Sequence, residues 1–124
     1  MSEQEKKDTR QEAEILAKLD HPNIIKLKEY FTSKKPQPTF NIVLEYADGG
    51  DLDKEIKNLP KGKYFSESQI IDWFCQLCLA IKYLHNKHII HRDLKAGNVF
   101  LMKSGYVRLG DFGIARTMKN TWEM

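Results

Sequence analysis

Apolar positions near the N-terminus recur at helical spacing. Ser2 and Glu5 have the S-x-x-E arrangement that caps a helix N-terminus. The apolar residues that follow stand three or four positions apart, and they are Ala13, Leu16, Ala17 and Leu19. At about 100° of rotation per residue, Glu12 lies within about 40° of this apolar face, whereas Glu14 lies about 200° away. We predict a helix from Ser2 to just before Asp20, with Glu12 on the buried face.

The next apolar residues are typical of strands. Ile24–Phe31 and Phe40–Tyr46 are separated by a polar, proline-containing stretch over residues 32–38, which predicts an antiparallel hairpin. The glycine-containing segment Asp48–Asp51 ends this pattern. A short charged helix is expected after it, ending near Asn58.

A second, longer helix is predicted from a second capping box. Ser66 and Gln69 form the box. An apolar stripe follows at helical intervals, and its members are Ile70, Phe74, Leu77, Cys78, Ile81 and Leu84. This stripe predicts a helix that buries one face, with Cys78 in the core.

The last two apolar runs are short and close together. Val99–Met102 and Tyr106–Leu109 are joined by Lys103-Ser104-Gly105, which predicts a tight hairpin. Helices and antiparallel hairpins therefore occur in separate blocks, as in an α+β protein.

Composition narrows the class of protein. The chain has 124 residues, of which 41% are hydrophobic and 30% charged, so it can bury a core. Twenty Lys and Arg stand against seventeen Asp and Glu, and they are scattered, so nucleic acid is not an expected partner. We find no membrane-spanning apolar run, no signal sequence at the polar N-terminus, and two cysteines only. An intracellular, cytoplasmic protein is expected.

Two polar loops flank the short hairpin. They are His91-Arg92-Asp93-Leu94-Lys95-Ala96-Gly97-Asn98 and Asp111-Phe112-Gly113. Both resemble the catalytic loop and the metal-binding motif of protein kinases. The resemblance implies an incomplete two-lobed α+β kinase fold, running from helix C to the start of the activation segment. Residues 1–45 would belong to the small lobe and residues 46–124 to the large lobe.

The same resemblance assigns catalytic roles. Asp93 would accept or orient the proton of the substrate hydroxyl, and Lys95 would neutralise the γ-phosphate. Asn98 and Asp111 would hold two Mg²⁺ ions. Taken singly, each acid or amide could instead cap a turn, as Asp and Asn often do, but their joint occurrence favours the catalytic interpretation.

The segment around residue 45 resembles the kinase hinge that receives the adenine of ATP. Glu45 C=O and Ala47 N–H would meet the purine edge, with Leu44 as the gatekeeper side chain. Asp51 matches the residue that reaches the ribose, and Phe100 would cover the lower face of adenine. Without the family, Asp51 is equally well explained as a helix N-cap.

The resemblance also gives Glu12 a partner, a lysine on the strand that precedes it in kinases. The alternative is an exposed acid on an amphipathic helix, which its place on the apolar face disfavours. A spine joining the two lobes would contain Leu16, Leu27, His91 and Phe112.

Among protein kinases, the chain looks most like the NIMA-related serine/threonine kinases, through residues 109–116, 45–52 and 65–70. Lys95 also favours protein Ser or Thr as the substrate. We find neither a Gly-rich loop nor a strand lysine before Glu12, and no A-P-E motif follows. Two alternatives are left open: a fragment of an active kinase, and an inactive kinase-like binding module. Regulatory partners could bind outside this fragment. By analogy, the location could extend to the cytoskeleton, centrosome, cilium or nucleus.

A zinc or redox site is an alternative interpretation of the cysteine and histidine residues. Cys75 and Cys78 share a helix face, and His85, His88 and His91 follow closely. A continuous helix through both cysteines lacks the turn of a zinc knuckle, so we favour the kinase interpretation.

Overall fold

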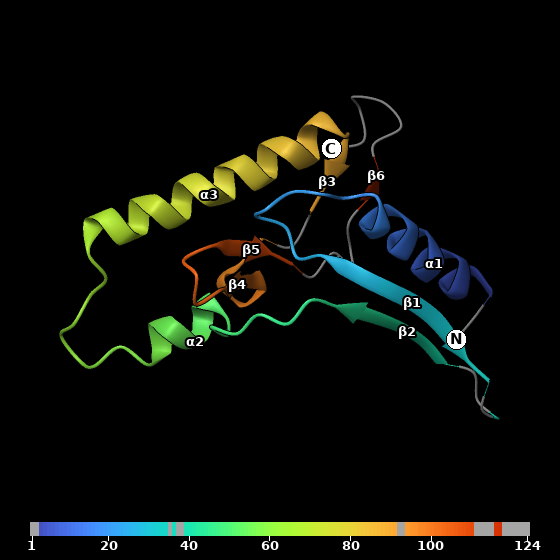
Figure 1. The fold of residues 1–124 in the computed structure, drawn as a ribbon, viewed down its shortest axis with the longest axis horizontal. Coiled ribbons are helices and arrows are strands. Elements are labelled where there is room, and N and C mark those ends of the chain that lie inside the picture. The colour runs from blue at the N-terminus through green and yellow to red at the C-terminus, as the bar shows by residue number, and fades with distance from the viewer. Residues whose placement is uncertain (1–2, 35, 37–38, 92–93, 111–115, 118–124) are drawn as a thin grey trace.

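The computed structural model describes residues 3–34, 36, 39–91, 94–110 and 116–117 (Figure 1). Its elements, in chain order, are α1 (Glu3–Ala17), β1 (Leu27–Ser33), β2 (Thr39–Leu44), α2 (Leu52–Lys57), α3 (Glu67–Asn86), β3 (Ile89–Ile90), the 3-10 helix η1 (Ala96–Asn98), β4 (Val99–Leu101), β5 (Val107–Leu109) and β6 (Arg116–Thr117). Three two-stranded antiparallel sheets, β1-β2, β3-β6 and β4-β5, lie among the helices of this described part. Helices and small antiparallel sheets give the α+β class that the sequence predicts.

The N-terminal helix is confirmed by α1, with Ser2 outside the described residues. Ala13, Leu16 and Leu19 are buried and Glu14 is exposed, as predicted, whereas Ala17, which was expected on the apolar face, is exposed. The backbone of Glu12 belongs to this helix, but its side chain lies outside what the structure describes. The helix ends at Ala17 rather than at Leu19, because Lys18 and Leu19 turn back onto the carbonyls of the last helical turn.

The first hairpin is confirmed by β1 and β2, which pair from Leu27 with Leu44 to Ser33 with Thr39. The first strand begins later than predicted. Ile24 pairs with Leu109 instead, and Ile25 N–H donates to the Leu109 carbonyl at 2.9 Å. Residues 24–25 therefore join β5, because that strand would otherwise leave backbone groups unpaired.

The long helix is confirmed, and its first turn is capped as predicted: Ser66 Oγ accepts from Gln69 N–H at 3.1 Å. The buried face, however, was predicted wrongly in part. Leu84 and Ala80 are fully buried, whereas Phe74 is 65% exposed. Ile70 and Cys78 are exposed as well, so Cys78 is not a core residue.

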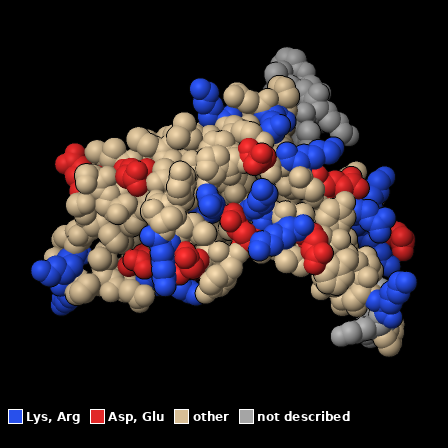
Figure 2. All heavy atoms as spheres, viewed as in Figure 1, with Lys and Arg blue, Asp and Glu red and all other residues tan. Residues whose placement is uncertain are grey.

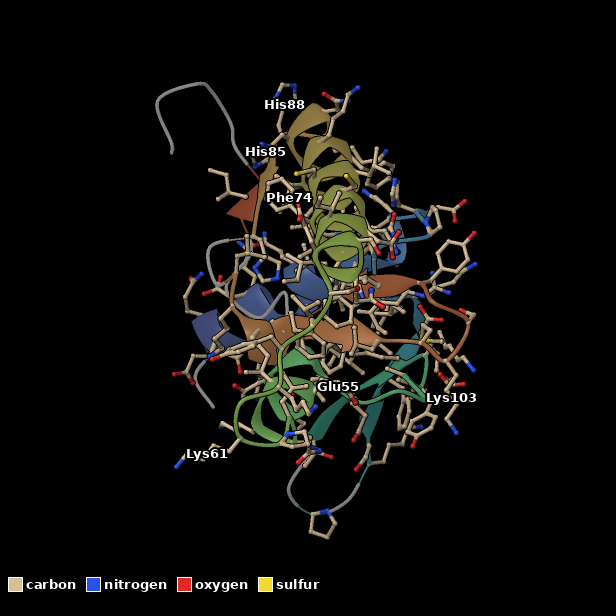
Figure 3. All side chains as sticks on the ribbon, turned by 90° about the vertical axis from the view of Figure 1, so that its left-hand side faces the viewer. Glu55, Lys61, Phe74, His85, His88 and Lys103 are labelled. Atoms are coloured by element: carbon tan, nitrogen blue, oxygen red, sulfur yellow. The ribbon has the colours of Figure 1, made fainter. Side chains whose placement is uncertain are left out.

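The error has a physical cause. α3 carries apolar residues on more than one face, and the described elements cover the face that contains Trp73, Leu77, Ala80 and Leu84. Ile70, Ile71, Phe74 and Leu79 remain exposed. Figure 2 shows few charged side chains over α3, and Figure 3 shows Phe74 and His85 on the same side of this helix. Among the described helices, none combines the length and the apolarity needed to cross a bilayer.

The second hairpin is confirmed by β4 and β5, which pair from Val99 with Leu109 to Leu101 with Val107. It supplies much of the core, since its inward residues pack with α3, β3 and the end of α1. The buried members of this cluster are Leu16, Leu19, Ile24, Ala80, Leu84, Ile89, Val99, Leu101, Val107 and Leu109. The core thus lies between α3 and the β4-β5 hairpin, and the end of α1 and the segment before β1 complete it.

Gly49 allows the segment after β2 to approach β4 closely. A Cβ at this position would lie 2.7 Å from the Leu101 carbonyl oxygen, which is backbone and cannot move aside. In a protein that joins this chain to the coding sequence flanking it in the genome, we expect Gly49→Ala to lower the free energy of unfolding by about 1–3 kcal/mol. Gly97→Ala is the matched control, because nothing lies within 4 Å of the position its Cβ would take. Equal melting temperatures for the two variants in thermal denaturation would contradict this assignment.

Candidate active site

The predicted hinge is anchored on the second hairpin. Gly49 N–H donates to the Leu101 carbonyl at 2.9 Å, and Leu101 N–H donates to the Gly50 carbonyl at 2.8 Å. Asp51 and Phe100 form an isolated antiparallel bridge next to this pair. Residues half a chain apart are therefore fixed side by side, and the predicted adenine-binding and ribose-binding segments share one edge of β4.

The predicted catalytic loop and the residue before the metal-binding motif are also joined. His91 is buried, and its Nε2 lies 2.6 Å from the Gly110 carbonyl oxygen. Gly110 N–H donates to the Asn98 carbonyl at 2.9 Å, and Asn98 N–H donates to the Lys95 carbonyl at 3.0 Å. These bonds hold both ends of the predicted catalytic loop, His91 and Asn98, against Gly110, the residue before the predicted metal-binding motif.

The predicted catalytic residues are only partly described. Asn98 is buried at 4% exposure, whereas Lys95 is exposed. Asp93 and Asp111 lie outside the described residues, as do Arg92 and Phe112. Their assignments remain predictions, but the residues that flank them, His91, Lys95, Asn98 and Gly110, are brought together.

Three of the predicted adenine-binding residues lie together, with Leu44 at the end of β2 and Glu45 and Ala47 just after it, whereas Phe100 lies on β4. Leu44 is 41% exposed, and Glu45, Ala47 and Phe100 are half-buried. Within the described part of the chain, no protein group donates to the Glu45 carbonyl or accepts from Ala47 N–H. A backbone acceptor and a backbone donor two residues apart suit a heterocycle that has one donor and one acceptor on its edge.

Asp51 is a helix N-cap, which is the alternative role that the sequence predicts for it. Its side chain caps α2, with Oδ1 accepting from Lys54 N–H at 2.9 Å and Oδ2 lying 4.0 Å from Lys54 Nζ. The side chain is 18% exposed. A carboxylate has further acceptor capacity beyond these contacts, so a ribose contact stays a prediction.

Sequence reasoning missed a buried polar network that joins three elements. Asn23, at 3% exposure, donates through Nδ2 to Gln76 Oε1 at 2.8 Å and to the Val107 carbonyl at 2.9 Å. Gln76 Oε1 also accepts from Val107 N–H at 2.7 Å, and Gln76 Nε2 donates to the Gly105 carbonyl at 3.1 Å. The available signal was a glutamine adjoining the apolar stripe of a helix.

The loop before Asn23 rests on α3 through aromatic contacts. The rings of His21 and Tyr83 have centroids 5.0 Å apart, and Tyr83 Oη accepts from Asp20 N–H at 2.9 Å. Burial lowers the pKa of His21, an effect that the charge of Asp20 partly opposes. The neutral ring is the form that can accept from Asn23 N–H at Nδ1, which it does at 3.0 Å.

The cysteine and histidine residues are spread over different surroundings. Cys75 and Cys78 are exposed free thiols, and His85 and His88 are exposed. His91 instead lies buried against Gly110. Among the described residues, no three His, Cys, Asp or Glu side chains form a group that could hold one metal ion.

Taken together, the described geometry places a backbone segment whose Glu45 carbonyl and Ala47 N–H have no protein partner among the described residues next to β4, the strand that follows the buried Asn98. Comparison with known proteins agrees with this geometry: residues 1–124 match the protein kinase domain. The chain belongs to the protein kinase domain family.

Its relatives identify a particular group of kinases. The chain is 48% identical over 124 residues to serine/threonine-protein kinase Nek1 of Mus musculus, covering 100% of this chain and 10% of that protein. It is 48% identical over 122 residues to serine/threonine-protein kinase Nek5 of Homo sapiens, covering 98% of this chain and 17% of that protein. For Nek3 of Mus musculus the identity is 47% over 112 residues, or 90% and 21% of the two chains.

These matches confirm the resemblance to NIMA-related kinases drawn from the sequence. The chain spans between 10% and 21% of the length of these three relatives. It therefore corresponds to a minor part of each of them.

Proposed function

We propose that this chain is the central segment of a protein serine/threonine kinase that transfers the γ-phosphoryl group of ATP to protein Ser or Thr. The observation that carries the proposal is that three segments are joined around β4: the predicted hinge, the predicted catalytic loop, and Gly110, which follows β5 and precedes the predicted metal-binding motif. Gly49 and Gly50 bond to Leu101, while Gly110 bonds to Asn98 and His91. Phosphoryl transfer depends on positioned groups more than on covalent chemistry, so fixing these segments to one another is what the reaction requires.

At the nucleotide end, Glu45 C=O and Ala47 N–H would bind the adenine edge, with Leu44 behind it and Phe100 on its lower face. Asp51 would contact the ribose. The support for this assignment is that both backbone groups lack a protein partner within the described residues.

At the phosphate end, the amide of Asn98 and the carboxylate of Asp111 are oxygen donors of the type that Mg²⁺ prefers. Bound Mg²⁺ would neutralise charge on the phosphates. The buried position of Asn98, at the end of η1 and just before β4, fits a fixed ligand. Asp93 would take or orient the proton of the substrate hydroxyl, and Lys95 would offset negative charge that develops on the transferred group.

The proposed division of the chain puts residues 1–45 in the small lobe and residues 46–124 in the large lobe. Glu12 would pair with a lysine supplied by the preceding strand of a complete small lobe. A cytoplasmic location, with cytoskeletal, centrosomal, ciliary or nuclear sites as alternatives, is proposed by analogy with the family.

The proposal is tested with two proteins: the 124-residue chain alone, and the chain joined to the coding sequence that flanks it in the genome. We expect the longer protein to phosphorylate a generic protein substrate on Ser or Thr with Mg-ATP. The chain alone should show no turnover and no cooperative melt, because the apolar residues of α3 stay exposed. If the longer protein binds Mg-ATP without turnover, the inactive binding module is the correct alternative.

A further inference from the structure

The back of the hinge carries an ion pair that the assigned roles do not use. Arg108 Nε lies 3.3 Å from Glu45 Oε1, and the two side chains are 18% and 20% exposed. Among the ion pairs of the described residues, this one has both partners mostly withdrawn from water; the pair of Lys57 with Asp53 has side chains 73% and 43% exposed. Such shielding makes a charge pair more sensitive to the loss of either partner.

Glu45 is held from two further directions. Its Oε1 accepts from Lys26 N–H at 2.9 Å, and its own N–H donates to the Lys26 carbonyl at 2.9 Å. The carboxylate is therefore shared by the backbone just before β1 and by the guanidinium on β5. A residue fixed by its side chain and by its N–H has little freedom left to reorient its carbonyl.

Arg108 is fixed as firmly as its partner. Its Nη1 donates to the Pro22 carbonyl, and the guanidinium lies over the Tyr106 ring at 5.3 Å from the ring centroid. The buried Nε makes no aligned hydrogen bond, so the nearby carboxylate of Glu45 is the group that compensates it. A hollow of about 310 Å³, lined by Pro22, Lys26 and both partners of the pair, opens beside them.

The position of Arg108 in the chain shows which two segments the ion pair connects. It is the central residue of β5, and two residues later Gly110 bonds to Asn98 and approaches His91. The pair thus connects the hinge, where the adenine is proposed to bind, with the strand that leads to Asp111. We propose that Arg108 is a positioning residue that, through Glu45, sets the hinge backbone for nucleotide binding; this inference rests on the proposed function.

The test uses the longer kinase protein with Arg108→Met, Glu45→Gln and the double variant. Met keeps an unbranched side chain but removes both the charge and the hydrogen bond to the Pro22 carbonyl. Gln keeps an acceptor for Lys26 N–H and removes mainly the charge. We expect each single variant to raise the Kd and the KM for Mg-ATP by about three- to tenfold, with kcat at saturating ATP changed by less than about twofold. The double variant should be no worse than either single one, because the two residues act as one unit.

Two further variants separate positioning from general stability. Arg108→Lys retains the positive charge and should recover part of the ATP affinity. Lys57→Met removes the exposed pair with Asp53 on α2 and should leave Kd, KM and kcat unchanged. A lowered melting temperature with unchanged ATP affinity would show that the pair only stabilises the fold, and would overturn the inference.

Three further results would overturn the inference about Arg108 and Glu45. Additive effects in the double variant would overturn the coupling of Arg108 to Glu45. A rise in kcat with unchanged KM would show that the pair restrains the enzyme instead of preparing its nucleotide site, which also overturns the inference. Failure of the unmodified longer protein to bind Mg-ATP at all would instead overturn the proposed function, and the inference with it.

Discussion

Replacing Asp93 by Asn in the longer kinase protein is expected to lower turnover by about 10²–10⁴-fold while Mg-ATP still binds. The substitution keeps the size of the side chain and removes the group that accepts or orients the proton of the substrate hydroxyl. The proposed nucleotide contacts come from other residues, namely those of the hinge, Phe100 and Asn98. Kinase assays at saturating ATP and nucleotide titrations of the same preparation measure the two effects separately.

Asp111→Ala is the comparison variant for this prediction. Asp111 follows Gly110, which is bonded to Asn98, and is proposed to hold Mg²⁺ together with that residue. Its loss should therefore weaken Mg-ATP binding as well as turnover. If both variants retain near-native turnover, the role assignments of both aspartates are wrong. If Asp93→Asn weakens binding as strongly as Asp111→Ala, the separation between substrate side and metal side is wrong.

The elements of the fold could be predicted because each carries its own local signal. Capping at Ser66, the polar loop over residues 32–38 and the turn at Gly105 all act within a few residues, and the structure has the corresponding helix and hairpins. The boundary at Ile24 could not be predicted in this way. That residue pairs with Leu109, 85 positions later in the chain, and no local pattern indicates such a partner.

The buried face of α3 shows a second limit of sequence reasoning. Both Ile70 and Leu84 fit helical spacing, but Leu84 is fully buried and Ile70 is 51% exposed. Spacing shows that residues share a face; it does not show which of several apolar faces finds a partner. Gln76 was missed for the same reason, since its amide is useful only once Asn23 and Val107 are placed beside it.

In the candidate site, too, the local motifs could be predicted from the sequence, and the contacts between distant residues could not. Motif spacing predicts a catalytic loop and a hinge, and the structure joins the segments that carry these predictions through Leu101, Gly110 and Asn98. The ion pair of Arg108 with Glu45 was not foreseen, because 63 residues separate its members and each side chain alone is typical of a solvated surface. Side-chain contacts between segments that are distant in the sequence become visible only in the folded structure.

Glu12 offers the sharpest test of how the N-terminal helix aligns with its family. Its backbone lies in α1 beside the buried Ala13, and one turn before the buried Leu16, whereas Glu14 is exposed on the other side of the helix. If Glu12 pairs with a lysine of a complete small lobe, Glu12→Gln removes the charge that orients that lysine toward the phosphates. Glu14→Gln removes the same charge from solvent and serves as the matched control.

We therefore expect Glu12→Gln to lower the turnover of the longer kinase protein by about tenfold or more, and Glu14→Gln to leave it unchanged. Neither variant should shift the melting temperature by much, because an exposed acid and a pair formed in the active arrangement both contribute little to global stability. Turnover and thermal denaturation are measured in parallel on both variants. Equal activity would show that Glu12 lacks the proposed partner, and the alignment of the whole of α1 with the regulatory helix of kinases would then be wrong.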